Sequence, residues 1–250
     1  MSNNIPSISF CFGAYNEEEI IFETIKNLND GLDKLIGKGN YEILVIENGS
    51  TDNTKKILKN IKNRSLRVVY ISKKGHGLAI KTAIEKARYN NVVITGADLP
   101  FGLTDLKRAL KLWHKYDLIF GSKLHPKSTY YTSQQRKVVS HIYSFLLRIF
   151  LNLEIKDPQG SIFIQRKKIL PLLKYCDSPN AFFTTQLAVY SQMHKLSIKE
   201  IPVSSSTISK YRASKYNVLS DGYKMFKAIM NEYAKASEIK NTELIKYENK

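Results

Sequence analysis

The feature that most constrains the fold is a regular alternation of short β-branched or aromatic runs with helical segments of roughly ten to twenty residues. Such alternation is typical of βαβ units, which build a mainly parallel sheet flanked by helices. Strands are predicted at residues 7–12, 41–46, 67–72, 92–95, 117–121, 161–165 and 198–204. Helices are predicted at residues 17–35, 52–62, 77–89, 104–115, 133–151, 167–174, 184–194 and 218–236. The sequence therefore predicts an α/β protein with a Rossmann-like sheet.

Length and composition predict one domain. The chain has 250 residues, of which 43% are hydrophobic and 24% charged, as in an ordinary globular protein. We expect a single domain over residues 1–236 and a flexible, Lys-rich tail over residues 237–250. Cys11 and Cys176 lie too far apart in the sequence for metal-ligand spacing or a disulfide framework, so we expect buried thiols in a reducing compartment.

The net charge of +17 predicts a surface that attracts polyanions. The lysines are scattered along most helices, which favours a solvated basic surface over a nucleic-acid-binding site. Residues 1–10 lack the features of a signal peptide, and no window approaches the roughly 18 apolar residues of a membrane span. The nearest candidate, residues 138–153, is interrupted by His141 and Arg148. We therefore expect a cytoplasmic protein in which residues 133–151 form an amphipathic helix, either packed on the sheet or lying on a membrane surface.

Polar residues gather directly after the first four predicted strands. The four corners read "GAYNEEE", "ENGSTDNT", "SKKGHG" and "GADLPFG". In a right-handed parallel arrangement all four emerge at one edge of the sheet, where open α/β sheets bind their ligands. This edge is the candidate site.

The second corner has two interpretations. In one, Asn48 and Gly49 make a tight turn, and Thr51 or Asp52 caps the following helix. In the other, Glu47 and Asp52 reach a ribose or a base while the start of the helix favours an anion.

The third corner also has two interpretations. Lys73, Lys74 and His76 surround two glycines at a helix start, and such a cluster suits a diphosphate. A turn with solvated lysines is the simpler alternative. Further along, "DPQGSIFIQRK" places Asp157 and Gln159 before a glycine and an apolar run, which also fits a plain turn.

Read together, these motifs resemble family 2 glycosyltransferases with the GT-A fold, and most closely their dolichol-phosphate mannosyltransferase-like branch. "AYNEE" resembles the opening motif, with Gly13 where proline is usual, and "IENGSTDNT" resembles "DDGSTDGT", with Glu47 and Asn48 in place of two aspartates. The resemblance continues through "KGHGLAIKTAIEKA", "GADLP", "FGSK", "DPQGSIFIQRK", "EIPV" and a final "SK", so it spans about residues 7 to 216.

The resemblance implies an inverting enzyme that moves a sugar from a nucleotide-sugar donor, GDP-mannose or a UDP-hexose, to a polyprenyl or dolichyl phosphate. The donor-binding residues that it implies are Ala14, Tyr15, Glu17, Glu47, Asn48, Asp52, Lys74, His76, Gly77, Ala97 and Asp98. Because the acceptor is already an anion, transfer in one displacement requires no strong general base. Catalysis would depend on in-line positioning and on stabilising the departing diphosphate.

The resemblance also implies a set of basic residues around the acceptor phosphate. Lys123 stands where the family prefers arginine, which keeps the charge but loses the bidentate fork. Arg136 matches a second position, and either Lys210 or Arg212 supplies the remaining cation. The predicted catalytic residues are thus Asp98, Lys123 and Arg136.

The family's metal-binding motif is incomplete in this chain. Its two aspartates and glutamine, which help to hold Mg²⁺ or Mn²⁺ against the diphosphate, correspond here to Gly96, Asp98 and Pro100. A hard divalent ion can complete its shell with water and phosphate oxygens, so Asp98 alone is the expected protein ligand. In the alternative, Lys73, Lys74 and His76 neutralise part of the charge.

A polyprenyl-phosphate acceptor would place the protein at the cytoplasmic face of a membrane, through its basic and amphipathic surfaces or through a membrane-protein partner. Two other functions stay open. One is transfer to a glycan hydroxyl, which would need a base near Asp157 or Asp98. The other is a protein that binds nucleotide sugars without turnover, as the loss of metal ligands at Gly96 and Pro100 suggests.

Overall fold

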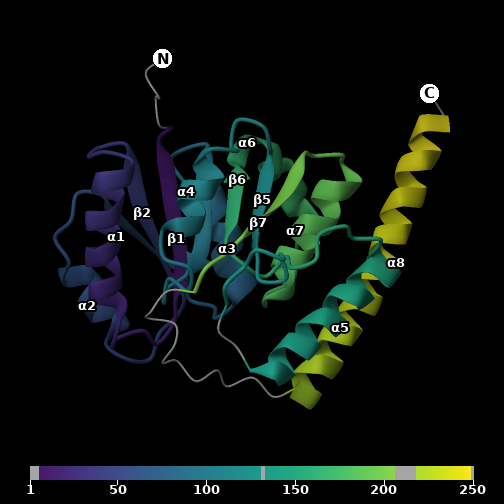
Figure 1. Ribbon diagram of the computed structural model, residues 1–250, viewed down its shortest axis with the longest axis horizontal. Helices are drawn as coiled ribbons and strands as arrows, with labels where there is room; N and C mark the ends of the chain where they lie inside the picture. Colours follow the sequence, from purple (N-terminus) through teal and green to yellow (C-terminus); the bar gives the residue numbers. More distant parts are fainter. Residues whose placement is uncertain (1–5, 131–132, 206–217, 249–250) are drawn as a thin grey trace.

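A single seven-stranded sheet forms the centre of the protein in a computed structural model (Figure 1). The structure describes residues 6–130, 133–205 and 218–248, with side chains of the last helix described over residues 223–240. The strands are β1 (Ile8–Ala14), β2 (Tyr41–Glu47), β3 (Leu66–Tyr70), β4 (Asn91–Gly96), β5 (Leu118–Ser122), β6 (Ile162–Gln165) and β7 (Ile198–Pro202). The helices are α1 (Ile21–Leu35), α2 (Thr54–Asn60), α3 (His76–Lys86), α4 (Thr104–Leu110), α5 (Gln134–Leu151), α6 (Arg166–Ile169), the 3₁₀ helix η1 (Leu170–Lys174), α7 (Phe182–Met193) and α8 (Val218–Glu248).

The strand order is β3-β2-β1-β4-β6-β5-β7. Neighbouring strands β1 to β4 are parallel, as are β5 and β7, whereas β6 runs antiparallel to both β4 and β5. The predicted mainly parallel sheet is therefore confirmed, with β6 as the exception. Because β1 to β4 run in one direction, the loops that follow them leave the sheet at the same edge, as the sequence predicts.

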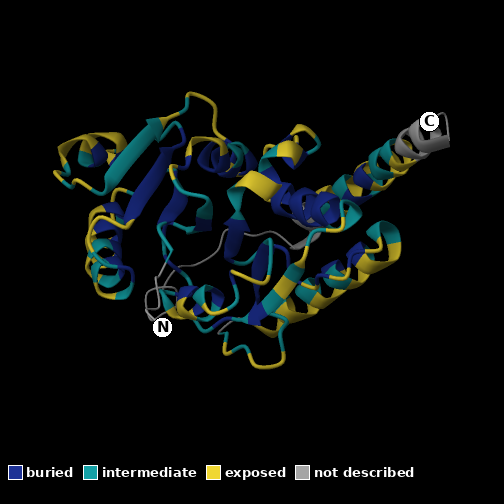
Figure 2. Ribbon diagram, turned by 90° about the horizontal axis from the view of Figure 1, so that it is seen from above, coloured by how far each residue is buried: buried dark blue, intermediate teal, exposed yellow. Residues whose placement is uncertain are grey.

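Both faces of the sheet are buried (Figure 2). One face packs on α1, α2 and α4, and the other packs on α3, α5, α7 and α8. Every residue of β2 is buried, and so is every residue of β1 except Gly13, which explains why these strands read as apolar runs rather than as alternating patterns. Most polar side chains of the central strands can therefore reach solvent only at the strand ends.

Helices α5 and α8 lie side by side at one end of the molecule, far from α1 and α2 (Figure 1). They pack through aromatic contacts, since the ring of Phe150 lies edge-on to Phe226 and to Tyr233. The structure continues α8 to Glu248, beyond the predicted end at residue 236. The predicted end of the last helix at residue 236 is therefore wrong. Residues 237–248 continue the helix because this Lys- and Glu-rich stretch is made largely of good helix formers.

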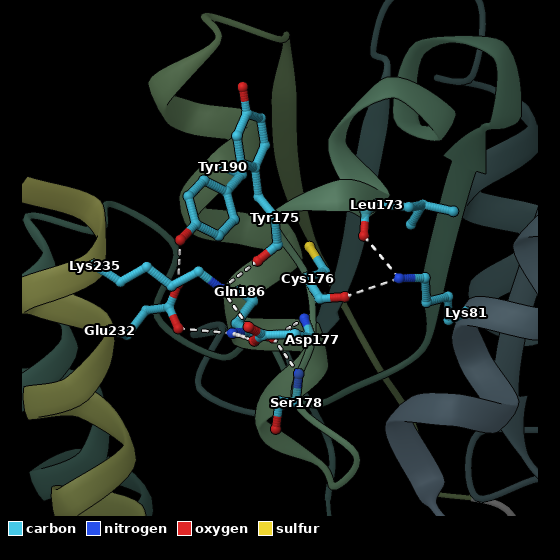
Figure 3. Close-up of polar contacts among 10 residues, drawn as sticks. All are labelled: Lys81, Leu173, Tyr175, Cys176, Asp177, Ser178, Gln186, Tyr190, Glu232 and Lys235. Atoms are coloured by element: carbon cyan, nitrogen blue, oxygen red, sulfur yellow. Dashed lines mark hydrogen bonds and ion pairs between the residues drawn. The ribbon is translucent and has the colours of Figure 1, made fainter. Parts of the chain in front are cut away.

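A polar network that is buried at Glu232 and exposed at Asp177 attaches α8 to the body of the protein (Figure 3). Glu232 of α8 is 3% exposed and accepts hydrogen bonds from Gln186 and Tyr190 of α7. Burial and the bond to this carboxylate both raise the pKa of Tyr190. Lys235, one turn further along α8, donates to the Tyr175 carbonyl and to the Asp177 carboxylate at 2.7 Å each. We call this network of α8 side chains and their partners the α8 latch.

Gly77 allows α3 to start in close contact with the 178–180 loop. Its N–H donates to the Pro179 carbonyl at 2.9 Å, and a β-carbon there would overlap the Ser178 carbonyl oxygen and lie 2.7 Å from Cβ of Phe183. The N–H of Gly77 is therefore already bonded within the protein, so it is not the group through which Gly77 would bind a diphosphate.

We expect Gly77→Ala to lower the free energy of unfolding by about 1–3 kcal/mol, the usual cost of overpacking. Urea denaturation would measure it. Gly39→Asn is the comparison, because a β-carbon there would meet no atom within 4 Å beyond its chain neighbours, so this variant carries the strain of a side chain at a φ of +83° but no packing clash. Equal midpoints for Gly77→Ala and the wild-type protein would contradict the packing role.

Candidate functional site

Hydrogen bonds join the loop after β1 to the loop after β2. Asn16 accepts from the Thr51 N–H at 2.8 Å, and its own N–H donates to Ser50 Oγ at 3.1 Å. Glu18 Oε2 accepts from the N–H and the side-chain amide of Asn53. Asn16 has a φ of 55°, a left-handed conformation that asparagine tolerates better than most residues. These polar residues of both motifs therefore hold the two loops together.

Asp52 belongs to the same junction. Its carboxylate accepts from the Glu18 N–H at 3.1 Å and from the Thr54 N–H at 2.9 Å. Although partial burial opposes ionisation, these hydrogen bonds lower the pKa of Asp52. Thr54 Oγ1 in turn accepts from the Glu17 N–H at 2.8 Å. The N-cap position of α2 is Asn53, so the cap predicted at Thr51 or Asp52 is off by at least one residue, although the Asp52 carboxylate does accept from the N–H of the first helical residue, Thr54.

Glu47 and Asn48 also make structural contacts. Glu47 is 2% exposed and accepts from the Ser50 N–H at 2.6 Å. The Asn48 amide makes two bonds to the backbone of Gly75, accepting from its N–H at 3.0 Å and donating to its carbonyl at 3.3 Å. Asn48 therefore fixes the loop after β2 against the loop after β3, and the tight-turn interpretation understates its role.

The cationic corner after β3 faces the first loop. Lys74 Nζ lies 3.9 Å from the centre of the Tyr15 ring, a cation–π contact between two residues predicted to bind the donor. The protein around His76 disfavours its charged form and lowers the pKa of the ring. This shift favours the neutral form of His76, whose ring can both donate and accept a hydrogen bond.

Two other predicted donor contacts lie deeper. Ala14 is completely buried and its carbonyl accepts from the Asn48 N–H, while Ala97 is 5% exposed and its carbonyl accepts from Thr24 Oγ1 at 2.9 Å. The carbonyl groups of Ala14 and Ala97 are thus engaged within the protein.

A cavity of about 250 Å³ opens at the end of β4, and we call it the strand-end cavity. Its lining includes His76, Gly96, Pro100, Lys123, Gln159 and Ser161. Residues from four predicted motifs therefore meet around one space. Asp52 and Asp98 are not among the residues that line it, although both lie at the same edge of the sheet.

The end of β4 does not supply a set of metal ligands. Within the described parts of the chain, no group of three His, Cys, Asp or Glu side chains could hold a metal ion. The Asp98 carboxylate folds back over Gly96, where a β-carbon would lie only 2.6 Å from Asp98 Oδ1. Neither Gly96 nor Pro100 offers a side-chain oxygen. The residues present therefore do not fit a metal ion held by the protein alone.

A second cavity, of about 390 Å³, lies between the loop after β5 and helix α5, and we call it the α5 cavity. Lys123 and Arg136, the two predicted acceptor-phosphate residues, both line it. The α5 cavity shares Lys123, Tyr130 and Gln159 with the strand-end cavity. The two spaces are therefore adjacent, and Lys123 lies at their common wall. Lys210 and Arg212 lie outside the described residues.

Asp157 holds Lys123 at this wall. Its carboxylate accepts from the Lys123 N–H at 2.7 Å and lies 3.5 Å from Lys123 Nζ. The Asp157 N–H donates to Glu200 of β7 at 3.1 Å. Two motifs that are far apart in the sequence, "DPQG" and "EIPV", thus support the predicted acceptor cation.

Sequence reasoning missed the contribution of Asp105 and Ser161. The Ser161 hydroxyl lies at the wall of the strand-end cavity and donates to the buried Asp105 carboxylate. Burial raises the pKa of Asp105 to about 6, against the opposing effect of the Ser161 hydrogen bond. At pH 7 the ionised carboxylate holds the Ser161 proton, so this hydroxyl offers only lone pairs to the cavity. An aspartate in the first turn of a helix reads as a cap, so the sequence carried no signal for this contact.

We expect the raised pKa of Asp105 to make stability depend on pH. The folded state retains the proton up to about pH 6, whereas the unfolded state releases it near the ordinary aspartate value of 3.8. The stabilising contribution is therefore complete below pH 3.8 and is lost as the pH rises through 6. Urea unfolding from pH 4 to pH 7 should show wild-type stability falling relative to Asp105→Asn by up to about 3 kcal/mol. If the free energies of unfolding of the two proteins differed by a constant amount from pH 4 to pH 7, the predicted effect of Asp105 would be contradicted.

Comparison with known proteins assigns the chain to a family. The family model described as glycosyl transferase family 2 matches residues 9–173. Because this match covers more than half of the chain, the protein belongs to glycosyl transferase family 2, as the resemblance predicts.

Individual relatives and solved structures agree with this assignment. The chain is 26% identical over 202 residues to glycosyltransferase AglD of Haloferax volcanii, covering 78% of this chain but only 32% of AglD. It is 24% identical to the UDP-N-acetylglucosamine–dolichyl-phosphate N-acetylglucosaminyltransferase of Methanococcus voltae, covering 85% of this chain and 90% of that protein. The crystal structure of glucosyl-3-phosphoglycerate synthase from Mycobacterium tuberculosis with UDP superimposes with a TM-score of 0.64 at 19% identity, covering 91% of this chain and 79% of that one. The GT-A fold predicted from the resemblance is confirmed.

Proposed function

We propose that the protein is an inverting glycosyltransferase that moves a sugar from a nucleotide-sugar donor to a polyprenyl phosphate. The observation that carries this proposal is the shared wall of the two cavities, where Lys123, Tyr130 and Gln159 line both. A donor on one side and an acceptor on the other would meet at this wall. Catalysis would then come from positioning and from charge stabilisation.

The donor would bind along the loops after β1 to β4. Hydrogen bonds among these loops fix their positions before a ligand arrives, which reduces the ordering cost of binding. Tyr15, Glu17, Lys74 and His76 would contact the nucleotide, with Asp52 close to the ribose. GDP-mannose and UDP-hexoses are both consistent with these side chains. Asp98 would be the one protein ligand of a Mg²⁺ or Mn²⁺ ion, a requirement that stays a prediction.

The acceptor phosphate would lie in the α5 cavity between Lys123 and Arg136. Two cations suit an anion that needs no deprotonation before it attacks the sugar. Transfer to a glycan hydroxyl would instead need a free base, and Asp157 is already bonded to Lys123. The Methanococcus voltae relative is named for a dolichyl-phosphate acceptor, which supports the first alternative.

We expect radiolabelled sugar to pass from UDP- or GDP-activated donors to polyprenyl phosphate, measured as label in lipid extracts. Lys123→Ala and Arg136→Ala should each lower this transfer at least about tenfold, because a charge-assisted contact to the phosphate is lost. Lys59→Ala on α2 is the control and should keep wild-type turnover. Label confined to oligosaccharide would favour the hydroxyl acceptor, and nucleotide binding without any transfer would favour the non-catalytic alternative.

An apolar stripe on α5 supports contact with a membrane surface. Val138, Ile142, Phe145 and Ile149 lie on one face of the helix, and each is between 53% and 62% exposed. Arg148, on the flank of this stripe, lines an adjoining outer cavity of about 630 Å³. A strip of exposed apolar residues beside cations, in a chain of net charge +17, suits an anionic bilayer. None of the helices that the structure describes is long and apolar enough to cross a membrane.

We expect the wild-type protein to sediment with phosphatidylcholine vesicles that contain phosphatidylglycerol. Replacing both Ile142 and Phe145 with serine should weaken this binding about tenfold or more, because two apolar side chains lose their burial in lipid. Phe22→Ser is the matched control, since Phe22 is 53% exposed on α1 at the opposite end of the molecule. Sedimentation of the double variant equal to that of the wild-type protein would contradict a lipid-facing role. So would a stable dimer of the wild-type protein that the double variant no longer forms.

A further inference from the structure

The side-chain amide nitrogen of Gln159 is a buried polar group without a hydrogen-bond partner among the residues that the structure describes. This nitrogen is inaccessible to solvent. An unpaired buried donor destabilises a fold, so each such case requires an explanation. Three other side chains share this property, namely Trp113, Ser122 and Ser191. Gln159 is the member of this group that lines the strand-end and α5 cavities.

Hydrogen bonding and close packing fix the backbone around Gln159, so the side chain starts from a defined position in the wall. The Gln159 N–H donates to the Asp157 carboxylate at 3.4 Å, and that carboxylate also binds Lys123. Gly160 packs so closely on Gly121 that any β-carbon would overlap the Gly121 carbonyl. Replacement of Gly160 would therefore displace the turn. The chain holds Gln159 beside Lys123 at the common wall.

The surrounding groups define which ligand could pair with the amide. Ser161, next along the wall, donates its proton to Asp105 and presents only lone pairs. Lys123 is a cation 3.5 Å from Asp157. The donors at the common wall include the Gln159 amide, the Lys123 ammonium and the Tyr130 hydroxyl, and a phosphate oxygen is an acceptor that each of them can serve.

We propose that Gln159 is a substrate-binding residue whose side-chain amide donates a hydrogen bond to a phosphate oxygen at the junction of the two cavities. This inference rests on the proposed function for the identity of the phosphate. The oxygen could belong to the nucleoside diphosphate or to the lipid phosphate, and the two sources share the same chemistry. In either case the ligand supplies the partner that the described part of the protein leaves out, once the Gln159 side chain turns its amide nitrogen toward the cavities that it lines.

Gln159→Leu separates this role from a structural one. Leucine removes the unpaired amide, so the melting temperature should stay the same or rise, while ligand binding falls roughly tenfold or more. Gln192→Leu is the matched control, because the Gln192 amide donates to the Asn152 carbonyl at 2.7 Å and accepts from the Glu154 N–H at 2.9 Å. That variant should lose thermal stability and keep wild-type affinity.

Isothermal titration of both variants and the wild-type protein would use three probes: UDP, GDP and citronellyl phosphate. Weaker binding of a nucleotide to Gln159→Leu places the oxygen on the donor, and weaker binding of citronellyl phosphate places it on the acceptor. The inference would be overturned if the wild-type protein and Gln159→Leu had equal affinity for every probe that binds and equal rates of sugar transfer. The proposed function would stand in that case. If Gln159→Leu binds a nucleotide more weakly than the wild-type protein does, but the wild-type protein transfers no sugar to lipid, the proposed function is overturned and the inference about Gln159 stands. A wild-type protein that binds no probe would overturn both.

Discussion

Burial of the central sheet on both faces is the constraint on which the rest of the structure depends. Strands β1 and β2 present almost no surface to solvent, so a polar side chain there needs a partner within the protein. Polar side chains that reach solvent therefore lie mainly at the ends of the strands. Because β1 to β4 run in parallel, their carboxyl ends gather the motif loops at one edge, and the strand-end cavity opens beside the end of β4.

The loops at this edge use much of their own polarity to hold one another. Asn16, Glu18 and Asp52 join the first two loops, and Asn48 joins the second to the third. A motif residue can therefore shape the edge of the sheet without touching a ligand. Capping and ligand binding compete as interpretations of the sequence, and the contacts that the structure shows are those that join the loops and the start of α2.

The fold was readable from the sequence because periodicity and turn residues act locally. Alternation of apolar runs with helical segments predicted the strands, and the order of the motifs predicted the common edge. Contacts between distant residues were not readable. Three contacts depend on chain segments that meet only after folding: the two bonds between Asn48 and Gly75, the hydrogen bond from Ser161 to Asp105, and the packing of Gly77 on residues 178–180. The antiparallel direction of β6 and the length of α8 were likewise hidden, since local composition does not specify strand direction or the end of a helix rich in lysine and glutamate.

The α8 latch has a consequence for the shape of the α5 cavity. Met225 of α8 lines the α5 cavity, two turns before Glu232 is anchored to Gln186 and Tyr190. A helix turns by about 100° for each residue along its axis, so a slip of a single position would swing Met225 away from that wall. The buried Glu232 carboxylate therefore sets the rotation of α8, and through it the position of Met225 in the lining of the α5 cavity.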